Sequence, residues 1–310
     1  MAIKGKERNG LSAASPSTQV DFCNIRGLHS NLSAVHYHLE SAPPTILFLT
    51  ETQISCPADT AYLLYPGYTF EHKFMRHAGV CMYARQEICC RRLHAFEDRD
   101  LSVLWVRVDY SGHTRVYACL YRSHSGNTET TRLFEHLHLT ADKLLEQYPS
   151  AELVILGDFN AHHVEWLGSR STDHAGRSAH EFSLAYGLSQ LVHSPTRIPD
   201  IEDHTSSLLD LLLTTRPDGY SVSVNAPLGS SDNCLVRIQA PCARPDPPRP
   251  TSSRRVWQYN ISQQIGTDCV NSTLRTHGDN SASHQKILTS AQPMLLRQYR
   301  WEWIVSFPTR

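Results

Sequence analysis

The sequence contains no long apolar stretch. No run of apolar residues reaches the roughly 18 needed to cross a bilayer, and the charged N-terminus is not followed by an apolar segment of the secretory type. An excess of charge of one sign is also missing, because 29 Lys and Arg residues are matched by 30 Asp and Glu residues. These absences argue against a membrane protein, a secreted protein and a histone-like basic tail. A nucleic acid would have to be held by a local basic patch or by metal ions.

The cysteines lack the spacing of a metal ribbon. The chain has 9 cysteines, but no two of them form a Cys-x-x-Cys pair, and their odd number argues against a disulfide framework. With 310 residues, 40% of them hydrophobic, the chain is long enough to bury a core without such links. We expect an intracellular globular protein in a reducing compartment.

Shifts in composition divide the chain into four parts. Residues 1–18 are rich in Ser, Ala, Gly and Lys without periodicity, and we predict a disordered leader there. One globular domain is predicted over 19–240. Five prolines within ten residues mark 241–253 as an extended linker. The mostly polar segment 254–310 has no sustained helical or strand period, and we expect a poorly ordered tail.

Short apolar or alternating runs rich in Val, Ile, Tyr and Phe recur through the predicted domain. They predict strands at 19–24, 45–50, 68–72, 78–84, 101–109, 114–121, 152–157, 208–213 and 231–238. Amphipathic stretches predict helices at 31–41, 128–147 and 176–188, the second with Thr128 as its N-cap. This alternation favours an α/β fold of two packed sheets flanked by helices.

Polar side chains stand where several of these strands end, which is where a rigid scaffold presents catalytic groups. Glu51 follows one apolar run, Tyr121 follows another, and Asp158-Phe159-Asn160 follows a third. The two-residue period of a strand places Asp158 and Asn160 on one side and Phe159 on the other. Asp210 lies inside the apolar run 208–213, where a carboxylate needs a partner or a metal ion.

Each of these residues also has an ordinary explanation. A glutamate after a strand is commonly a solvated acid, and a tyrosine is commonly an amphipathic boundary residue. His162 and His163 lack the His-Glu-x-x-His spacing of a zinc site. The functional argument therefore depends on the occurrence of all these polar groups together in one chain.

Six motifs follow one another along the sequence. In chain order they are Asn24-Ile25-Arg26-Gly27-Leu28, Thr50-Glu51-Thr52, Tyr121-Arg122-Ser123, Gly157-Asp158-Phe159-Asn160-Ala161-His162-His163, Leu209-Asp210-Leu211 and Gly229-Ser230-Ser231-Asp232. Over about residues 20–238 the chain thereby resembles the endonuclease/exonuclease/phosphatase family. Within that family it is similar to the apurinic-type endonuclease domain of LINE-like, jockey-type non-LTR retrotransposons.

The resemblance implies a four-layered α/β sandwich, with two packed mixed β-sheets flanked by helices, and a divalent-metal phosphodiesterase site. Asn24, Glu51 and Asp232 would hold magnesium or manganese, which are cations that prefer oxygen ligands. Arg122 and His163 would contact DNA. No small-molecule cofactor and no membrane are implied.

The resemblance also assigns roles in hydrolysis of a DNA phosphodiester. Asp158 would orient and activate the attacking water, and Asn160 would hydrogen-bond the reacting phosphate. Tyr121 would support the developing negative charge, as preorganised donors do. Asp210 would hold a catalytic histidine in place.

The last motif departs from the family pattern. Family members have Ser-Asp-His, whereas this chain has Ser231-Asp232-Asn233. A histidine beside an aspartate can carry a charge, but the Asn233 amide is neutral, and Asp210 loses the group that it would orient. Acid–base and oxyanion-type contributions are each on the order of 10² to 10⁴ in rate, so we predict a strongly impaired nuclease.

Three functions are open at this point. The first is a retrotransposon endonuclease that nicks target DNA in the nucleus, although the reverse transcriptase domain expected in the parent element does not occur in these 310 residues. The second is a catalytically inactive or domesticated DNA-binding remnant. The third is a phosphodiesterase acting on lipid head groups, for which the sequence offers no basic amphipathic membrane helix and no lipidation motif.

Overall fold

A computed structural model describes residues 17–55, 60–110, 112–124, 126–198 and 206–242. The predicted tail 254–310 lies outside these residues, as do residues 1–16 of the predicted leader and 243–253 of the predicted linker. No helix in the described part of the chain is long and apolar enough to cross a membrane.

The strands extend beyond the predicted domain at both ends. β1 (Ser17–Asn24) begins inside the predicted leader, and β12 (Leu235–Pro241) ends inside the predicted linker. The two strands pair, with Ser17 opposite Pro241 and Thr18 opposite Ala240. Backbone pairing thus extends two residues before the predicted domain and one residue beyond it, because pairing continues after the apolar signal has ended.

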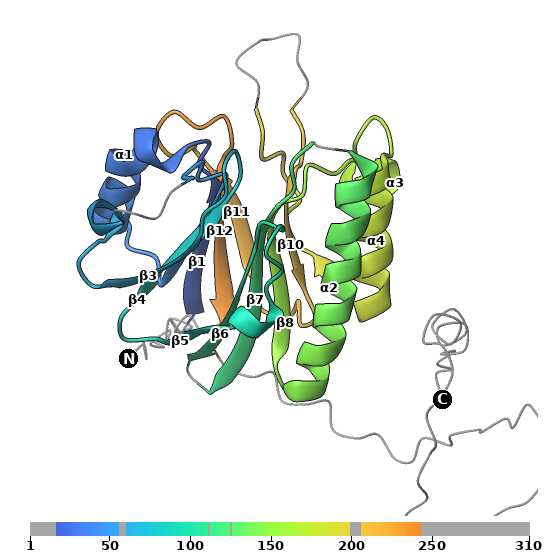
Figure 1. The fold of residues 1–310 in the computed structure, drawn as a ribbon, viewed down its shortest axis with the longest axis horizontal. Helices are drawn as coiled ribbons and strands as arrows, with labels where there is room; N and C mark the ends of the chain where they lie inside the picture. Colours follow the sequence, from blue (N-terminus) through green and yellow to red (C-terminus); the bar gives the residue numbers. More distant parts are fainter. Residues whose placement is uncertain (1–16, 56–59, 111, 125, 199–205, 243–310) are drawn as a thin grey trace, which may run out of the picture. The chain divides into compact units, whose positions relative to one another are not determined.

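The first sheet combines β1 and β12 with β2 (Ile46–Thr50), β3 (Tyr68–Lys73), β4 (Val80–Arg85) and β11 (Ser221–Asn225). Its strand order is β11-β12-β1-β2-β4-β3 (Figure 1). Only β1 and β2 run parallel among the pairs of this sheet. The sheet is therefore mixed.

The second sheet has the same number of strands and the same mixed character. It consists of β5 (Cys89–Arg92), β6 (Val103–Tyr110), β7 (His113–Tyr121), β8 (Glu152–Asp158), β9 (Ser189–Gln190) and β10 (Asp210–Thr214). Its order is β5-β6-β7-β8-β10-β9, and only β7 and β8 run parallel among its pairs.

Helices cover the outer faces of the two sheets (Figure 1). α1 (Leu28–Ser41) packs on the first sheet, while α2 (Asn127–Gln147) and α4 (His174–Tyr186) pack on the second. The shorter elements are α3 (Val164–Leu167), η1 (Ala61–Leu63) and η2 (His94–Phe96). The four-layered α/β sandwich is thereby confirmed.

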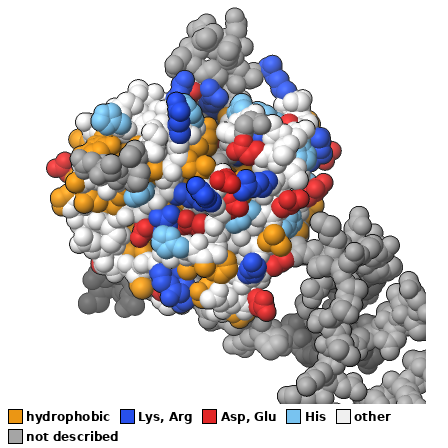
Figure 2. All heavy atoms as spheres, in the orientation of Figure 1, with side chains coloured by type: hydrophobic (Ala, Val, Ile, Leu, Met, Phe, Trp, Pro, Cys, Tyr) orange, Lys and Arg blue, Asp and Glu red, His pale blue; other side chains and the backbone are white. Residues whose placement is uncertain are grey.

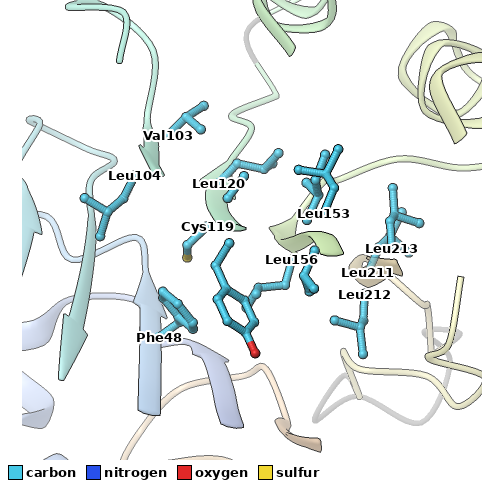
Figure 3. Packing of buried hydrophobic residues seen from close by; sticks show 14 of the residues in the cluster. Phe48, Val103, Leu104, Cys119, Leu120, Leu153, Leu156, Leu211, Leu212 and Leu213 are labelled. Carbon is cyan, nitrogen blue, oxygen red and sulfur yellow. The ribbon is translucent and has the colours of Figure 1, made fainter. Parts of the chain in front are cut away.

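Side-chain alternation builds the layers. On β2, Ile46 and Phe48 belong to the core between the sheets, whereas Leu47 and Leu49 belong to the core beneath α1. The Phe48 ring lies 5.6 Å from the Tyr117 ring of β7, and Figure 3 shows Phe48 near Cys119 in this core. A strand buried on both faces reads as a continuous apolar run, which explains why the sequence signal for β2 is strong.

All of the predicted strands and helices occur, with small shifts of their ends. The strands that the sequence did not predict are β5, β9 and β11, and each of them lies at the edge of its sheet. An edge strand pairs with one neighbour only and carries a weak apolar pattern. The predicted N-cap Thr128 is wrong, because Gly126 occupies that position and α2 has no side-chain cap.

Candidate active site

The carboxyl ends of both parallel strand pairs meet at one edge of the sandwich. Asn24 ends β1, and its side chain donates a hydrogen bond to Asp158 at the end of β8 in the other sheet. A cleft of about 260 Å³ opens there. It is lined by Asn24, Arg26, Glu51, Tyr121, His124, Asp158, Asn160, Arg197, Leu209, Asp232 and Asn233. The structure thus brings together all the predicted metal and catalytic residues except Asp210, which lies buried behind the cleft wall next to Leu209.

Asn24 joins two carboxylates through a single amide nitrogen. Its Nδ2 donates to Glu51 Oε2 at 2.9 Å and to Asp158 Oδ2 at 2.7 Å. Its Oδ1 accepts from the backbone N–H of Arg26 at 3.1 Å. No Lys or Arg among the described residues forms an ion pair with Glu51 or Asp158. Two neighbouring carboxylates held by a neutral amide create a place for a cation.

The backbone around these residues is strained. Among the described non-glycine residues only five have a positive φ, and Arg26 (48°), Glu51 (53°), Gln53 (56°) and Asn160 (45°) are four of them. Such conformations are uncommon for residues with a Cβ and cluster at functional sites. The clustering supports this end of the sandwich as the candidate site.

Gly157 allows β8 to bring Asp158 into position. A Cβ at Gly157, where φ is 150°, would lie 2.0 Å from the Leu120 carbonyl oxygen of β7. Only glycine permits this approach of the two backbones. The next residue, Asp158, lies opposite Tyr121 in the parallel ladder, so β7 and β8 present both side chains at the same level.

Asp158 is a buried carboxylate with an altered acidity. Burial raises its pKa to about 7, although hydrogen bonds from Asn24 and from the Asn160 backbone N–H oppose the shift and the charge of Glu51 adds to it. The Asn160 N–H lies 2.9 Å from Asp158 Oδ1. Phe159 is fully buried, as the strand alternation predicts. A carboxyl group with a pKa near 7 is suited to accept a proton at neutral pH.

Tyr121 lines the cleft as a half-buried side chain. Burial raises its pKa above the ordinary value, and the negative charges of Glu51 and Asp158 raise it further. The phenol therefore keeps its proton at physiological pH. A neutral hydroxyl in this position can donate a hydrogen bond to an anionic group in the cleft.

Arg122, predicted to contact DNA, is buried under the same loop. Its Nε donates to the Phe159 carbonyl oxygen at 2.6 Å, and its Nη2 donates to the Asn160 carbonyl oxygen. In return Asn160 Nδ2 donates to the Arg122 carbonyl oxygen at 2.7 Å. These bonds fix the loop after β8, which is a positioning role that the sequence did not predict.

Asp232 is neutralised by two arginines. Arg26 Nη1 and Arg197 Nη2 each lie 3.0 Å from Asp232 Oδ2, and Asn233 Nδ2 donates to Asp232 Oδ1 at 3.0 Å. The carboxylate is thus less available to a metal ion than that of Glu51. Its predicted role as a ligand stays a prediction.

Asp210 and Asn233 carry buried polar atoms without partners. Neither carboxylate oxygen of Asp210, nor Oδ1 of Asn233, has a hydrogen-bond partner among the described residues. Burial raises the pKa of Asp210 well above its ordinary value, and the charge of Asp158 raises it further. The Thr196 hydroxyl opposes this shift, and no hydrogen bond joins the side chains of Asp210 and Asn233. The predicted role of Asp210 stays a prediction.

Several residues of this region were not assigned from the sequence. Arg26 and Arg197 reach the cleft from loops, and His124 lines it without belonging to a ligand pair. His163, predicted to contact DNA, lines none of the described hollows at this edge; its Nδ1 accepts from the Trp166 N–H at the start of α3. Its neighbour His162 lines a second hollow, which lies beside the cleft. Only Arg26 had a sequence signal, because it stands in the first motif.

The oxygen donors fit a hard cation with few protein ligands. No three His, Cys, Asp or Glu side chains of the described residues form a preformed metal cage. Glu51 is half-buried and faces the cleft, with Gln53 Nε2 and Asn24 Nδ2 holding its two oxygens at 2.8 and 2.9 Å. Magnesium binds through one or two carboxylates and keeps several waters, so this donor set suits it.

Comparison with known proteins agrees with the fold and with the family that the sequence resembles. The model of the Endonuclease/Exonuclease/phosphatase family matches residues 22–237. No curated protein sequence matches the chain. The endonuclease domain of TRAS1, a telomere-specific non-LTR retrotransposon, is similar in structure at 15% identity and a TM-score of 0.58, covering 73% of this chain and 99% of that domain.

Two further solved structures share the fold. AP endonuclease LMAP from Leishmania major has 16% identity and a TM-score of 0.57, with 73% of this chain and 88% of that chain covered. The 3'-5' exonuclease NExo from Neisseria meningitidis has 17% identity and a TM-score of 0.56, with 72% and 100% covered. Because the family model spans well over half of the sequence, the chain belongs to the endonuclease/exonuclease/phosphatase family.

Proposed function

We propose that this protein is a divalent-metal-dependent DNA endonuclease of the non-LTR retrotransposon type, impaired by Asn233. The observation that carries the proposal is the bridge from Asn24 to the carboxylates of Glu51 and Asp158. Two carboxylates without a basic partner in a polar cleft favour the binding of a cation, and a bound cation in turn attracts a phosphate. Members of the family are metal-dependent phosphodiesterases.

Glu51 would hold magnesium or manganese, with Asn24 and Gln53 fixing the carboxylate and Asp232 available once it leaves its arginines. The bound ion would neutralise the charge of the reacting phosphate and orient it. The strained backbone at Glu51 places the carboxylate without further rearrangement.

The protein groups divide the remaining tasks. Asp158 would take the proton of the attacking water, because burial brings its pKa to about 7. Tyr121 would donate from its neutral hydroxyl to the phosphate oxygen on which charge develops. Asn160 Nδ2 donates one hydrogen bond to the Arg122 carbonyl oxygen and would donate a second to the phosphate.

The impairment follows from the last motif. Asn233 offers a neutral amide, and that amide already donates to Asp232. The leaving oxygen thus lacks the charged donor that an imidazole would provide. The loss corresponds to about 10² to 10⁴ in rate.

DNA as the substrate is supported by similarity in fold. A structure of the Neisseria 3' phosphatase NExo bound to a product DNA hairpin matches with a TM-score of 0.52 and 17% identity. The similarity to the TRAS1 domain supports the retrotransposon origin, and such an enzyme would act in the nucleus.

A second candidate function is a DNA-binding remnant without catalysis. The unpartnered oxygens of Asp210 favour it, because a functional site does not ordinarily leave a buried carboxylate without a partner. This candidate predicts DNA binding without strand cleavage.

The test is nicking of supercoiled plasmid by the full chain with magnesium or with a chelator. Slow, magnesium-dependent nicking that disappears in Asp158→Ala supports the endonuclease. Binding of the plasmid without nicking supports the remnant. Cleavage of phosphoinositide or sphingolipid head groups with no effect on plasmid would overturn both.

A further inference from the structure

A second hollow adjoins the cleft. It has a volume of about 240 Å³, and it shares His124 and Asn160 with the cleft, so the two form one continuous depression. Its other charged or titratable lining residues are Arg122, His162, Asp173 and His174. The cleft is lined by three carboxylates, whereas basic side chains predominate in the hollow.

The guanidinium of Arg122 is a buried positive charge that makes no direct ion pair with a carboxylate of the described residues. Arg122 is 7% exposed, and all its hydrogen bonds go to carbonyl oxygens and to the Thr130 hydroxyl. No carboxylate of the described residues forms an ion pair with it. These four bonds leave one of its five N–H groups free. Burial lowers the pKa of Arg122, and the negative charges of Asp173 and Asp158 oppose that shift without contacting the guanidinium. An anion at the free N–H would add a direct, charge-assisted contact.

The imidazoles of the hollow add free donors. The rings of His124 and His162 have no hydrogen-bond partner among the described residues, and His174 Nε2 contacts only the Thr131 hydroxyl at 3.1 Å. Partial burial and then the positive charges of Arg122, Arg197 and His162 lower the pKa of His124, so at neutral pH its ring offers a hydrogen bond and not a charge.

The single carboxylate lining the hollow, Asp173, offsets part of this charge, because it acts on both Arg122 and His124. Asp173 Oδ1 accepts from the backbone N–H of Gly176 at 2.6 Å and from that of His162 at 3.2 Å. It is therefore occupied as the N-cap of α4. Over the described part of the face in Figure 2, acidic and basic side chains are intermixed, so the charge in the hollow is a local feature.

We propose that this hollow binds the phosphate that neighbours the scissile phosphate in a nucleic-acid strand, with Arg122, His124, His162 and His174 as its contacts. The inference deepens the proposed function and rests on it. The substrate would then be a nucleic-acid strand with at least two successive phosphodiesters, because one strand would occupy the cleft and the hollow at once. A lipid head group with a single phosphate would fill the cleft only.

The test compares binding of two short thymidine oligomers to the full chain with magnesium, by isothermal titration calorimetry. The dimer has one phosphate and the trimer has two. We expect the second phosphate to improve affinity about 10-fold, the size of a charge-assisted hydrogen bond. In His124→Gln/His162→Gln the gain should fall below about 2-fold. His94→Gln, which changes an exposed histidine of η2, should keep the gain.

The outcomes separate the inference from the proposed function. His124 is exposed and His162 is half-buried, so an unchanged melting temperature verifies that the double variant is folded. Equal affinity for dimer and trimer, or a gain that survives in His124→Gln/His162→Gln, would overturn the inference while leaving nuclease activity intact. Failure of plasmid DNA to bind would overturn both. Binding of phosphatidylcholine vesicles containing phosphatidylinositol bisphosphate, without binding of the trimer, would assign the hollow to a lipid.

Discussion

Restoring a histidine at position 233 should raise activity and stability together. Asn233 is 4% exposed, and its Oδ1 has no partner among the described residues, like both carboxylate oxygens of Asp210. Arg197 links the two residues, because it forms a β-bridge with Asn233 and its charge acts on Asp210. In Asn233→His the imidazole would donate to Asp210 and present its other nitrogen to the cleft.

The magnitudes follow from the groups involved. A buried unsatisfied polar group costs about 1–3 kcal/mol, so pairing with Asp210 should stabilise the fold by that order. For a domain of this size each kcal/mol shifts the melting temperature by roughly 2–4 °C. An imidazole that shares its proton with the leaving oxygen should raise the nicking rate by about 10² to 10⁴.

Two assays check the prediction. Single-turnover nicking of supercoiled plasmid with magnesium gives the rate, and thermal unfolding followed by circular dichroism gives the melting temperature. The control is Asn233→His/Asp210→Asn, in which the imidazole is present but its charged partner is not. The control should lose most of both gains.

The reasoning is refuted if Asn233→His nicks no faster than the parent protein and melts no higher. A gain in rate that Asp210→Asn leaves unchanged would refute the link between the two residues. A rise in stability alone would show that the pair forms but that the cleft does not catalyse.

The other predictions concern stability in chelator. The pKa of Asp210 is raised in the folded state. As pH rises, the unfolded chain loses this proton at about 4 while the folded protein keeps it, so stability falls until the pH passes the folded-state pKa; Asp210→Asn should flatten this decline between pH 4 and 8 in thermal melts. Gly157→Ala should destabilise the domain by more than about 3 kcal/mol in urea titrations, because its Cβ would meet the Leu120 oxygen at 2.0 Å. In the buried Arg115–Glu152 pair, Nε and Oε2 are 2.7 Å apart. Arg115→Met should lower the free energy of unfolding by about 3–5 kcal/mol, because it leaves Glu152 buried and unpaired, and Arg115→Met/Glu152→Leu should lower it far less. The first prediction is contradicted if Asp210→Asn leaves the pH dependence of stability unchanged. The second is contradicted if Gly157→Ala is as stable as the parent protein, and the third if the single and double variants lose the same free energy of unfolding.

The sequence predicted the central part of the fold because central strands are buried on both faces. β2 and β8 are continuous apolar runs, and the ends of these runs located Glu51 and Asp158. The edge strands escaped prediction for the opposite reason. β5 contains Cys-Cys-Arg-Arg, a sequence whose strand conformation depends on pairing with β6.

The site was predictable where a motif marked a strand end, and not where loops converge. Arg197 contacts Asp232, which lies 35 positions further along the sequence, and no local sequence pattern predicts that contact. The same holds for the hollow, where His124, His162 and His174 come from three separate loops or helix starts. Long-range charge pairing is a property of the tertiary fold, so a single sequence does not reveal it.

The claim on which the account depends is that the carboxylates at this edge bind a divalent cation. A titration of the full chain with manganese, followed by electron paramagnetic resonance of the free ion, tests it without requiring activity. Glu51→Gln removes one carboxylate of the cleft, and Glu165→Gln, at an exposed residue of α3, is the matched control. We expect one manganese site in the parent and in Glu165→Gln, and affinity at least about 10-fold weaker in Glu51→Gln. Absence of binding in the parent, or equal binding in all three proteins, would contradict it.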